Sequence, residues 1–169
     1  PTIGAFPEWK ALKKLRTLEI DCPEPVGFYS KGANPAKLKS FLVTKSLKET
    51  NSLEEALQKG KFQELDFPIK KRFIEKVALI SRNLHENGIN HRDYYLCHFH
   101  VDKNMNVEKE ISLIDLHRAQ LRSFVPARWA SKDIGGLFHS AMGFKLNERD
   151  FYRFLKIYFQ CSLKEALET

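Results

Sequence analysis

The chain has 169 residues, enough for one domain with a real hydrophobic core but short for a complete two-lobed enzyme. Hydrophobic residues make up 43% and charged residues 29%, a balance that excludes wholesale disorder. The net charge of +7 predicts a surface that attracts anions: nucleic acid, phosphorylated glycolipid or an acidic membrane face.

The sequence lacks an apolar run long enough to span a membrane and an N-terminal secretory signal, so we expect a cytosolic protein that can touch a membrane. The three cysteines are far apart, without the C-x-x-C spacing of a zinc site, and are expected to be ordinary thiols. Because the chain begins with Pro1 and not with methionine, we expect that an upstream segment was removed or left out.

The first elements are a helix and a strand pair. Pro7 suits a first helical turn, and apolar residues then recur at three-residue steps as far as Leu15. Segments 26–29 and 41–44 have the composition of strands, and residues 31–35 between them are turn formers. We expect a small antiparallel pair.

Two helices are predicted next. Ser52 followed by Glu55 forms a capping box, which predicts a helix start. From Pro68 a second helix runs to Gly88, its C-terminal cap. Its apolar positions recur at steps of three and four and are Ile69, Phe73, Val77, Ile80 and Leu84.

The rest of the chain is predicted to be two short extended pieces followed by helices. Segments 99–101 and 111–116 are extended, with a polar turn at 102–106 between them. The helical remainder has three candidate N-caps, Ser131, Asn147 and Ser162. Its apolar face is formed by Phe151, Phe154, Leu155, Tyr158 and Phe159.

Two acidic motifs follow the long helix in a fixed order. The first is His91-Arg92-Asp93, and the second is Ile114-Asp115-Leu116-His117. Protein kinases carry H-R-D-x-x-x-x-N and then D-F-G in this order, and His98 here occupies the place of the asparagine. The pair at this spacing is a stronger signal than either motif alone.

Phosphoryl transfer explains why such residues would be needed, since the protein must aim a hydroxyl and neutralise phosphate charge. Asp93 would accept the hydroxyl proton, and Asp115 would bind Mg²⁺, which prefers carboxylate oxygen. His98 would either bind the metal, for which imidazole is less suited, or donate to a phosphate oxygen. The alternative, in which Asp93 caps a turn and Asp115 is a solvated residue at a strand end, stays open.

Longer segments resemble the lipopolysaccharide core heptose(I) kinase family. They are G-I-N-H-R-D-Y-Y-L-C-H-F from Gly88 and I-D-L-H-R-A-Q-L-R from Ile114. The resemblance continues through V-P-A-R-W from Val125, K-D at Lys132, E-R-D-F-Y-R-F from Glu148, Glu8-Trp9 and Asn34-Pro35, and so covers nearly the whole chain.

The resemblance implies an α+β, protein-kinase-like fold, with the rear of a small lobe and the hinge in residues 1–47 and a mainly helical large lobe in 48–169. It implies a kinase that uses ATP and Mg²⁺ to phosphorylate the first heptose of the lipopolysaccharide core. The acceptor would be the core glycolipid, met at the cytoplasmic face of the inner membrane, with peripheral membrane contact and no nucleic acid as partner. A kinase of another core sugar, such as 3-deoxy-octulosonic acid, is the alternative.

The resemblance also implies roles for single residues. Asp93 would be the catalytic base, flanked by His91 and Arg92, and Asp115 would be the metal ligand. Glu8 would be the helix glutamate that pairs with the ATP-binding lysine in kinases, or it would be an exposed first-turn carboxylate favoured by the helix dipole. ATP would further contact His98 and a hinge from Thr44 to Leu47, which includes Lys45 and Leu47 and faces the adenine through its backbone. Asp133 would brace the catalytic loop from a later helix, or it would be a first-turn acid after a cap at Ser131.

The sequence departs from the kinase pattern in two places. Only seven residues precede Glu8, so the glycine-rich loop and the lysine-bearing strand of kinases are not in this chain. His117 stands where D-F-G has glycine, although the family shares this form. We therefore expect either a fragment of a kinase or a shortened relative, and a non-catalytic binding protein is the main alternative to an enzyme.

Two further function classes are disfavoured. A zinc hydrolase could draw on Cys97, His91, His98 and His100, the last two on one side of a strand, but no known zinc spacing is present. A nucleic-acid module would explain the charge, yet the sequence lacks a recognised nucleic-acid motif.

Overall fold

The computed structural model describes residues 4–32, 34, 37–144, 146–162 and 164–165. The predicted turn at 31–35 includes residues 33 and 35, which lie outside this set, as does Pro35 of the Asn34-Pro35 match. Within the described residues, no helix has the length and apolar character needed to cross a bilayer.

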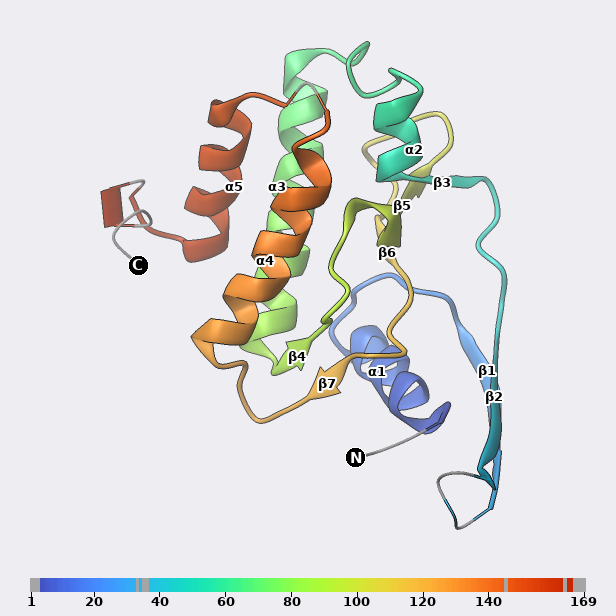
Figure 1. Cartoon of the computed structure of the whole chain (residues 1–169). Helices are drawn as coiled ribbons and strands as arrows, with labels where there is room; N and C mark the ends of the chain where they lie inside the picture. The colour runs from blue at the N-terminus through green and yellow to red at the C-terminus, as the bar shows by residue number, and fades with distance from the viewer. Residues whose placement is uncertain (1–3, 33, 35–36, 145, 163, 166–169) are drawn as a thin grey trace.

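The N-terminal part is a helix packed against a two-stranded ribbon (Figure 1). Helix α1 spans Phe6–Thr17 and buries Leu12 and Leu15. Strands β1 (Pro25–Lys31) and β2 (Lys39–Thr44) pair antiparallel, as predicted. Phe28 of β1 meets the rings of Phe6 and Trp9 with centroids 5.2 Å apart, which attaches the ribbon to α1.

The C-terminal part is mainly helical. Helices α2 (Leu53–Gln58), α3 (Phe67–Glu86), α4 (Ala127–Ala141) and α5 (Glu148–Phe159) make up most of it, with α4 and α5 lying alongside the long α3 (Figure 1). The Ser52 side chain accepts from the Glu55 amide, as the predicted cap requires, and Asn147 forms a capping box with Asp150. Ser162 exchanges hydrogen bonds with Glu165, consistent with a third cap.

The prediction of a cap at Ser131 was wrong. Helix α4 begins four residues earlier, at Ala127, because Pro126 supplies an extended residue directly before the first turn. Ser131 is therefore inside the helix, and Asp133 is in its second turn and not in its first.

Short strands position the loops between these helices. Strands β3 (Thr50–Ser52), β5 (Phe99–Asp102) and β6 (Ser112–Leu113) form one sheet, and β4 (Ile89–Asn90) pairs with β7 (Gln120–Leu121). The predicted strand at 111–116 is only two residues long. A 3₁₀ turn at Leu96–His98 precedes β5, so His98 is not on a strand with His100 as expected.

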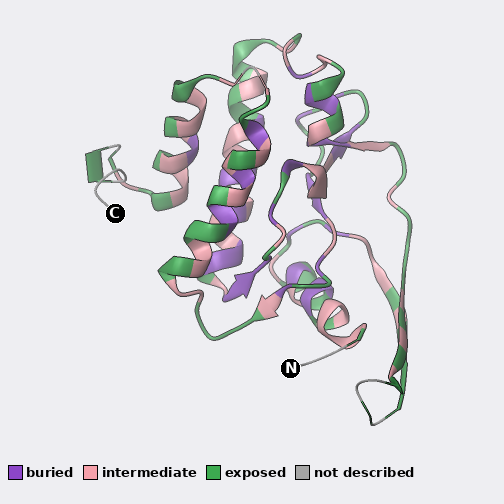
Figure 2. Ribbon diagram, viewed as in Figure 1, coloured by how far each residue is buried: buried purple, intermediate pink, exposed green. Residues whose placement is uncertain are grey.

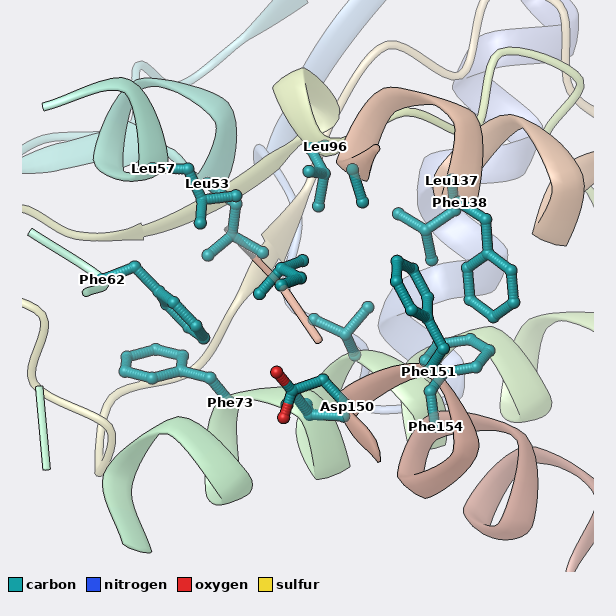
Figure 3. Close-up of a pocket in the computed structure, with 14 residues that line it drawn as sticks. Leu53, Leu57, Phe62, Phe73, Leu96, Leu137, Phe138, Asp150, Phe151 and Phe154 are labelled. Carbon is teal, nitrogen blue, oxygen red and sulfur yellow. The ribbon is translucent and has the colours of Figure 1, made fainter. Parts of the chain in front are cut away.

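The four helices of the C-terminal part enclose a small apolar cavity of about 70 Å³ (Figure 3). Phe73 of α3 and Phe154 of α5 line it, together with Leu53 of α2 and Leu137 of α4. Asp150 also reaches the lining, but every exposed lining surface is apolar. Leu96, near the end of the loop that carries the first acidic motif, also lines the cavity, but neither Asp93 nor Asp115 does.

Candidate active site

The catalytic loop is the segment from Gly88 to His98, and its start depends on a glycine. Gly88 has φ +74°, and a Cβ at this position would lie 2.1 Å from the carbonyl oxygen of Arg122. The Arg122 amide in turn donates to the Gly88 carbonyl at 2.8 Å. Only glycine permits this close approach, which joins the loop to β7.

Asp133 of α4 holds the backbone of the catalytic loop. Its carboxylate accepts from the amides of His91 (2.8 Å) and Arg92 (2.9 Å) and from Asn90 Nδ2 (2.7 Å). His85 Nε2 lies 3.3 Å away. Burial alone would raise the pKa of Asp133, but these four contacts hold it below its usual range. Asp133 therefore braces the catalytic loop from a later helix, as the sequence predicted. Its bond to the Arg92 amide holds a residue whose φ is +76°.

His91 links the catalytic loop to the loop that carries Asp115. The ring is fully buried, and its Nε2 donates to the Ile114 carbonyl at 3.0 Å. Burial lowers the pKa of His91 to about 4, so the ring is neutral. Its Nδ1 has no hydrogen-bond partner among the described residues. The His91 side chain is therefore shielded from solvent and holds the catalytic loop against the Asp115 loop.

His98 connects the loop that carries Asp93 to the loop that carries Asp115. His98 Nδ1 donates to the Asp93 carbonyl at 2.6 Å, and its Nε2 lies 3.3 Å from Asp115 Oδ2. The His98 ring also stacks on His91, with centroids 5.7 Å apart. Asp115 has φ +61°, a conformation that few non-glycine residues adopt, and its carboxylate also contacts His117.

Arg118 was missed by the sequence analysis as a site residue. Its Nη1 donates to Asp93 Oδ1 at 2.6 Å, while half of the Arg118 side chain stays exposed. The signal was present, because Arg118 follows Ile114-Asp115-Leu116-His117 directly. Arg92, in contrast, is exposed and contributes its backbone amide to the site.

A cleft of about 490 Å³ lies between the two parts of the chain, next to Asp115. Glu8 of α1 lines it from one side, and the connection from Thr44 to Leu47, which includes Lys45, lines it from the other. Burial raises the pKa of Glu8, and the negative charge of Asp115 raises it further, while His117 lowers it. Glu8 has no ion-pair partner among the described residues, and Lys45 pairs with Glu24 at 2.7 Å.

The groups beside Asp115 that could hold a cation are one carboxylate and one imidazole. His98 Nδ1 donates to a carbonyl, and its Nε2 faces Asp115 Oδ2 at 3.3 Å, so a small cation could be held between these two side chains. Within the described chain, no three His, Cys, Asp or Glu side chains gather as a metal site. One or two protein ligands supplemented by phosphates are usual for Mg²⁺.

The fold and the paired acidic loops are those of a protein-kinase-like, α+β protein. The profile of the lipopolysaccharide kinase (Kdo/WaaP) family matches residues 1–158, and the chain belongs to this family. The solved structure described as WaaP in complex with acyl carrier protein superposes with a TM-score of 0.89 at 36% identity, covering 98% of this chain and 70% of that one.

Curated relatives agree with this assignment. The lipopolysaccharide core heptose(I) kinase WaaP of Escherichia coli is 43% identical over 171 residues, which cover 99% of this chain and 64% of the relative. The protein of the same name from Pseudomonas aeruginosa is 38% identical over 170 residues, covering 99% of this chain and 63% of the relative. The chain thus spans less than two thirds of the length of these relatives.

Proposed function

We propose that this chain carries the catalytic and metal-binding loops of an ATP-dependent kinase that phosphorylates a heptose of the lipopolysaccharide inner core. One observation carries the proposal: His98 contacts both the Asp93 backbone carbonyl and the Asp115 carboxylate, and Arg118, three residues after Asp115, bonds the Asp93 carboxylate. The names of the curated relatives supply the acceptor, heptose I. A 3-deoxy-octulosonic acid kinase is the alternative that the family description supports.

The residues divide the work of phosphoryl transfer. Asp93 receives the proton of the attacking hydroxyl and aims its oxygen. Asp115, with His98 beside it, would hold Mg²⁺, which neutralises phosphate charge when bound. Glu8, Lys45 and Leu47 line the cleft in which we place the nucleotide.

Arg118 contacts Asp93, the proposed general base, directly. Its guanidinium occupies Oδ1 of Asp93, an oxygen that would otherwise be open to the proton of the attacking hydroxyl. Because Arg118 is half exposed and approaches Asp93 from the loop that carries Asp115, it can turn its guanidinium to a phosphate group and release Asp93. Arginine suits this exchange, since carboxylate and phosphate present similar pairs of oxygen atoms.

Phosphate transfer from labelled ATP to purified core glycolipid tests the proposal directly. Asp93→Asn should lower the rate by about 10²–10⁴-fold, the usual effect of a general base, with the melting temperature nearly unchanged. Asp115→Asn should abolish the dependence of nucleotide binding on added Mg²⁺. Wild-type rates from either variant would remove that residue from the mechanism.

The same experiment separates the alternatives. Acceptor glycolipids that lack heptose but retain 3-deoxy-octulosonic acid should not be phosphorylated, and transfer to them would favour the other sugar kinase. If calorimetry shows no Mg²⁺-ATP binding by this chain and no transfer is measured, the chain alone is not a kinase, and it is then either a non-catalytic binding protein or a fragment that needs the glycine-rich loop.

Acyl carrier protein is a second candidate partner, because the solved relative was determined in complex with one. We propose that it binds near the apolar cavity of Figure 3, which an acyl chain could enter. Thermal melting with acylated and unacylated carrier tests this. Stabilisation by the acylated form alone, lost in Leu137→Trp, is the expected result.

A further inference from the structure

One surface segment of the chain concentrates positive charge. Residues 116–132 contain four arginine or lysine residues and no aspartate or glutamate. The segment leaves the Asp115 loop, passes through β7 and enters the first turns of α4 (Figure 1). A stretch without acidic residues in a chain where charged residues make up 29% creates a local field that attracts anions.

Three of these cations surround one tryptophan. The Trp129 ring has Arg128 at 4.7 Å, Lys132 at 4.9 Å and Arg122 at 5.9 Å from its centroid. None of the three makes a salt bridge within the described chain. Their charge is therefore available to an outside ligand, and the half-buried ring keeps the three side chains together.

Large apolar side chains are exposed in the same segment. Phe124 is 66% exposed and Leu121 38% exposed. Phe124 also lines a groove of about 670 Å³ whose other walls include Ile134 of α4 and Phe159 of α5. An exposed phenylalanine costs free energy in water, whereas at a lipid headgroup boundary it is favourable.

We propose that this segment docks on an anionic phospholipid surface. The docking residues, called the Trp129 surface below, are Leu121, Arg122, Phe124, Arg128, Trp129 and Lys132. The cations would meet lipid phosphates while Phe124 and the edge of Trp129 enter the interface, the arrangement that amphipathic membrane anchors use.

The partner is argued from the mixture of side chains. A soluble phosphate would need the cations alone and would leave Phe124 and Leu121 unexplained. A nucleic acid would also use the cations and could stack on Trp129, but it gains little from the groove beside Phe124. Of these three ligands, a lipid surface is the one that uses the charge, the aromatic ring and the exposed apolar residues together.

The Trp129 surface is attached rigidly to the catalytic loop. The Arg122 amide bonds to the Gly88 carbonyl, and Lys132 precedes the bracing residue Asp133. Docking would therefore present the active site at a fixed height and tilt above the bilayer, where a lipid-anchored acceptor is found. The docking itself does not require phosphoryl transfer, so it can be tested without ATP.

Vesicle flotation of the full chain tests the docking surface. The protein should float with vesicles of phosphatidylglycerol and phosphatidylethanolamine, float less at high salt, and stay unbound with phosphatidylcholine alone. Replacing Arg122, Arg128 and Lys132 by glutamine should weaken binding about a hundredfold, since each cation near an anionic surface contributes roughly a factor of five. Phe124→Ser should weaken it about tenfold.

A matched control removes the same charge elsewhere. Lys71, Arg149 and Lys156 are exposed on the outer face of α3 and α5, so their replacement by glutamine should leave vesicle binding within about twofold of wild type. Equal loss in both triple variants would overturn the proposal in favour of unspecific charge attraction. Wild-type vesicle binding by the Arg122, Arg128 and Lys132 variant would overturn the proposal as well. So would a result in which this variant loses binding to double-stranded DNA but keeps its binding to vesicles.

Discussion

The catalytic loop and the β1–β2 ribbon lie in different parts of the chain and are built in opposite ways. The catalytic loop buries His91 and Tyr94 and donates hydrogen bonds to Asp133 of α4 and to the Ile114 carbonyl, whereas both strands of the ribbon are mostly exposed (Figure 2). The ribbon is attached through the Phe28 contacts with α1. The difference teaches that a loop carrying reactive groups must hold its atoms in fixed positions, whereas a ribbon that only covers a ligand can be attached by few contacts.

The largest stability effect is expected at Asp133. Asp133→Ala removes a buried carboxylate that satisfies four donors, so the free energy of unfolding should fall by about 3–5 kcal/mol. Asp66→Ala is the control, because Asp66 is exposed and its side chain makes no cap bond. Urea unfolding measures both. A loss below about 1 kcal/mol at Asp133 would show that the loop is not braced as described.

A smaller effect is expected at Gly88. Gly88→Ala should destabilise by about 2 kcal/mol or more, because the new Cβ would meet the Arg122 carbonyl in addition to the strain of a positive φ. Gly60 has the same φ of +74° but nothing within 4 Å of an added Cβ. Gly60→Ala should therefore cost only about 1 kcal/mol of strain. Equal losses in the two variants would mean that β7 does not confine the catalytic loop.

Acid should weaken the catalytic loop before it affects the ribbon. The folded-state pKa of His91 is about 4 against 6.5 when unfolded, so the unfolded state binds the extra proton and stability falls as pH decreases from 6.5 to 4. The depressed pKa of Asp133 acts in the same direction at the lower end of this window. Urea unfolding should show a slope approaching about 1.4 kcal/mol per pH unit, which His91→Gln should reduce.

The smallest effects belong to the ribbon. Phe41 stacks on Tyr29 on the exposed face, with centroids 5.5 Å apart, and is 57% exposed. Phe41→Ser should change the free energy of unfolding by about 0.5 kcal/mol or less. Phe28→Ala removes the contact with α1 and should cost about 1 kcal/mol. A cost at Phe41 as large as that at Phe28 would contradict the contrast between the two regions.

Much of this arrangement could be predicted from the sequence, because helix periodicity and motif order are local signals. The capping residues Ser52 and Asn147, the helix that ends just before Gly88 and the order of the two acidic loops follow from spacing. The predicted cap at Ser131 was wrong because a serine shortly before an acidic residue resembles a cap, whereas the helix in fact begins after Pro126. Arg118 stands directly after the second motif in the sequence, but its contact with Asp93 depends on the tertiary fold of two loops and could not be read from spacing.

The four contacts to Asp133 have an evolutionary consequence. Two come from side chains, His85 and Asn90, and two from backbone amides that any residue would supply. A lineage that lost the aspartate would leave His85 and Asn90 without their buried acceptor. A lineage that lost Asn90 would leave the buried Asp133 carboxylate with one hydrogen-bond donor fewer to compensate its charge. Positions 85, 90 and 133 should thus diverge jointly among relatives, as an inherited unit and not as three independent sites.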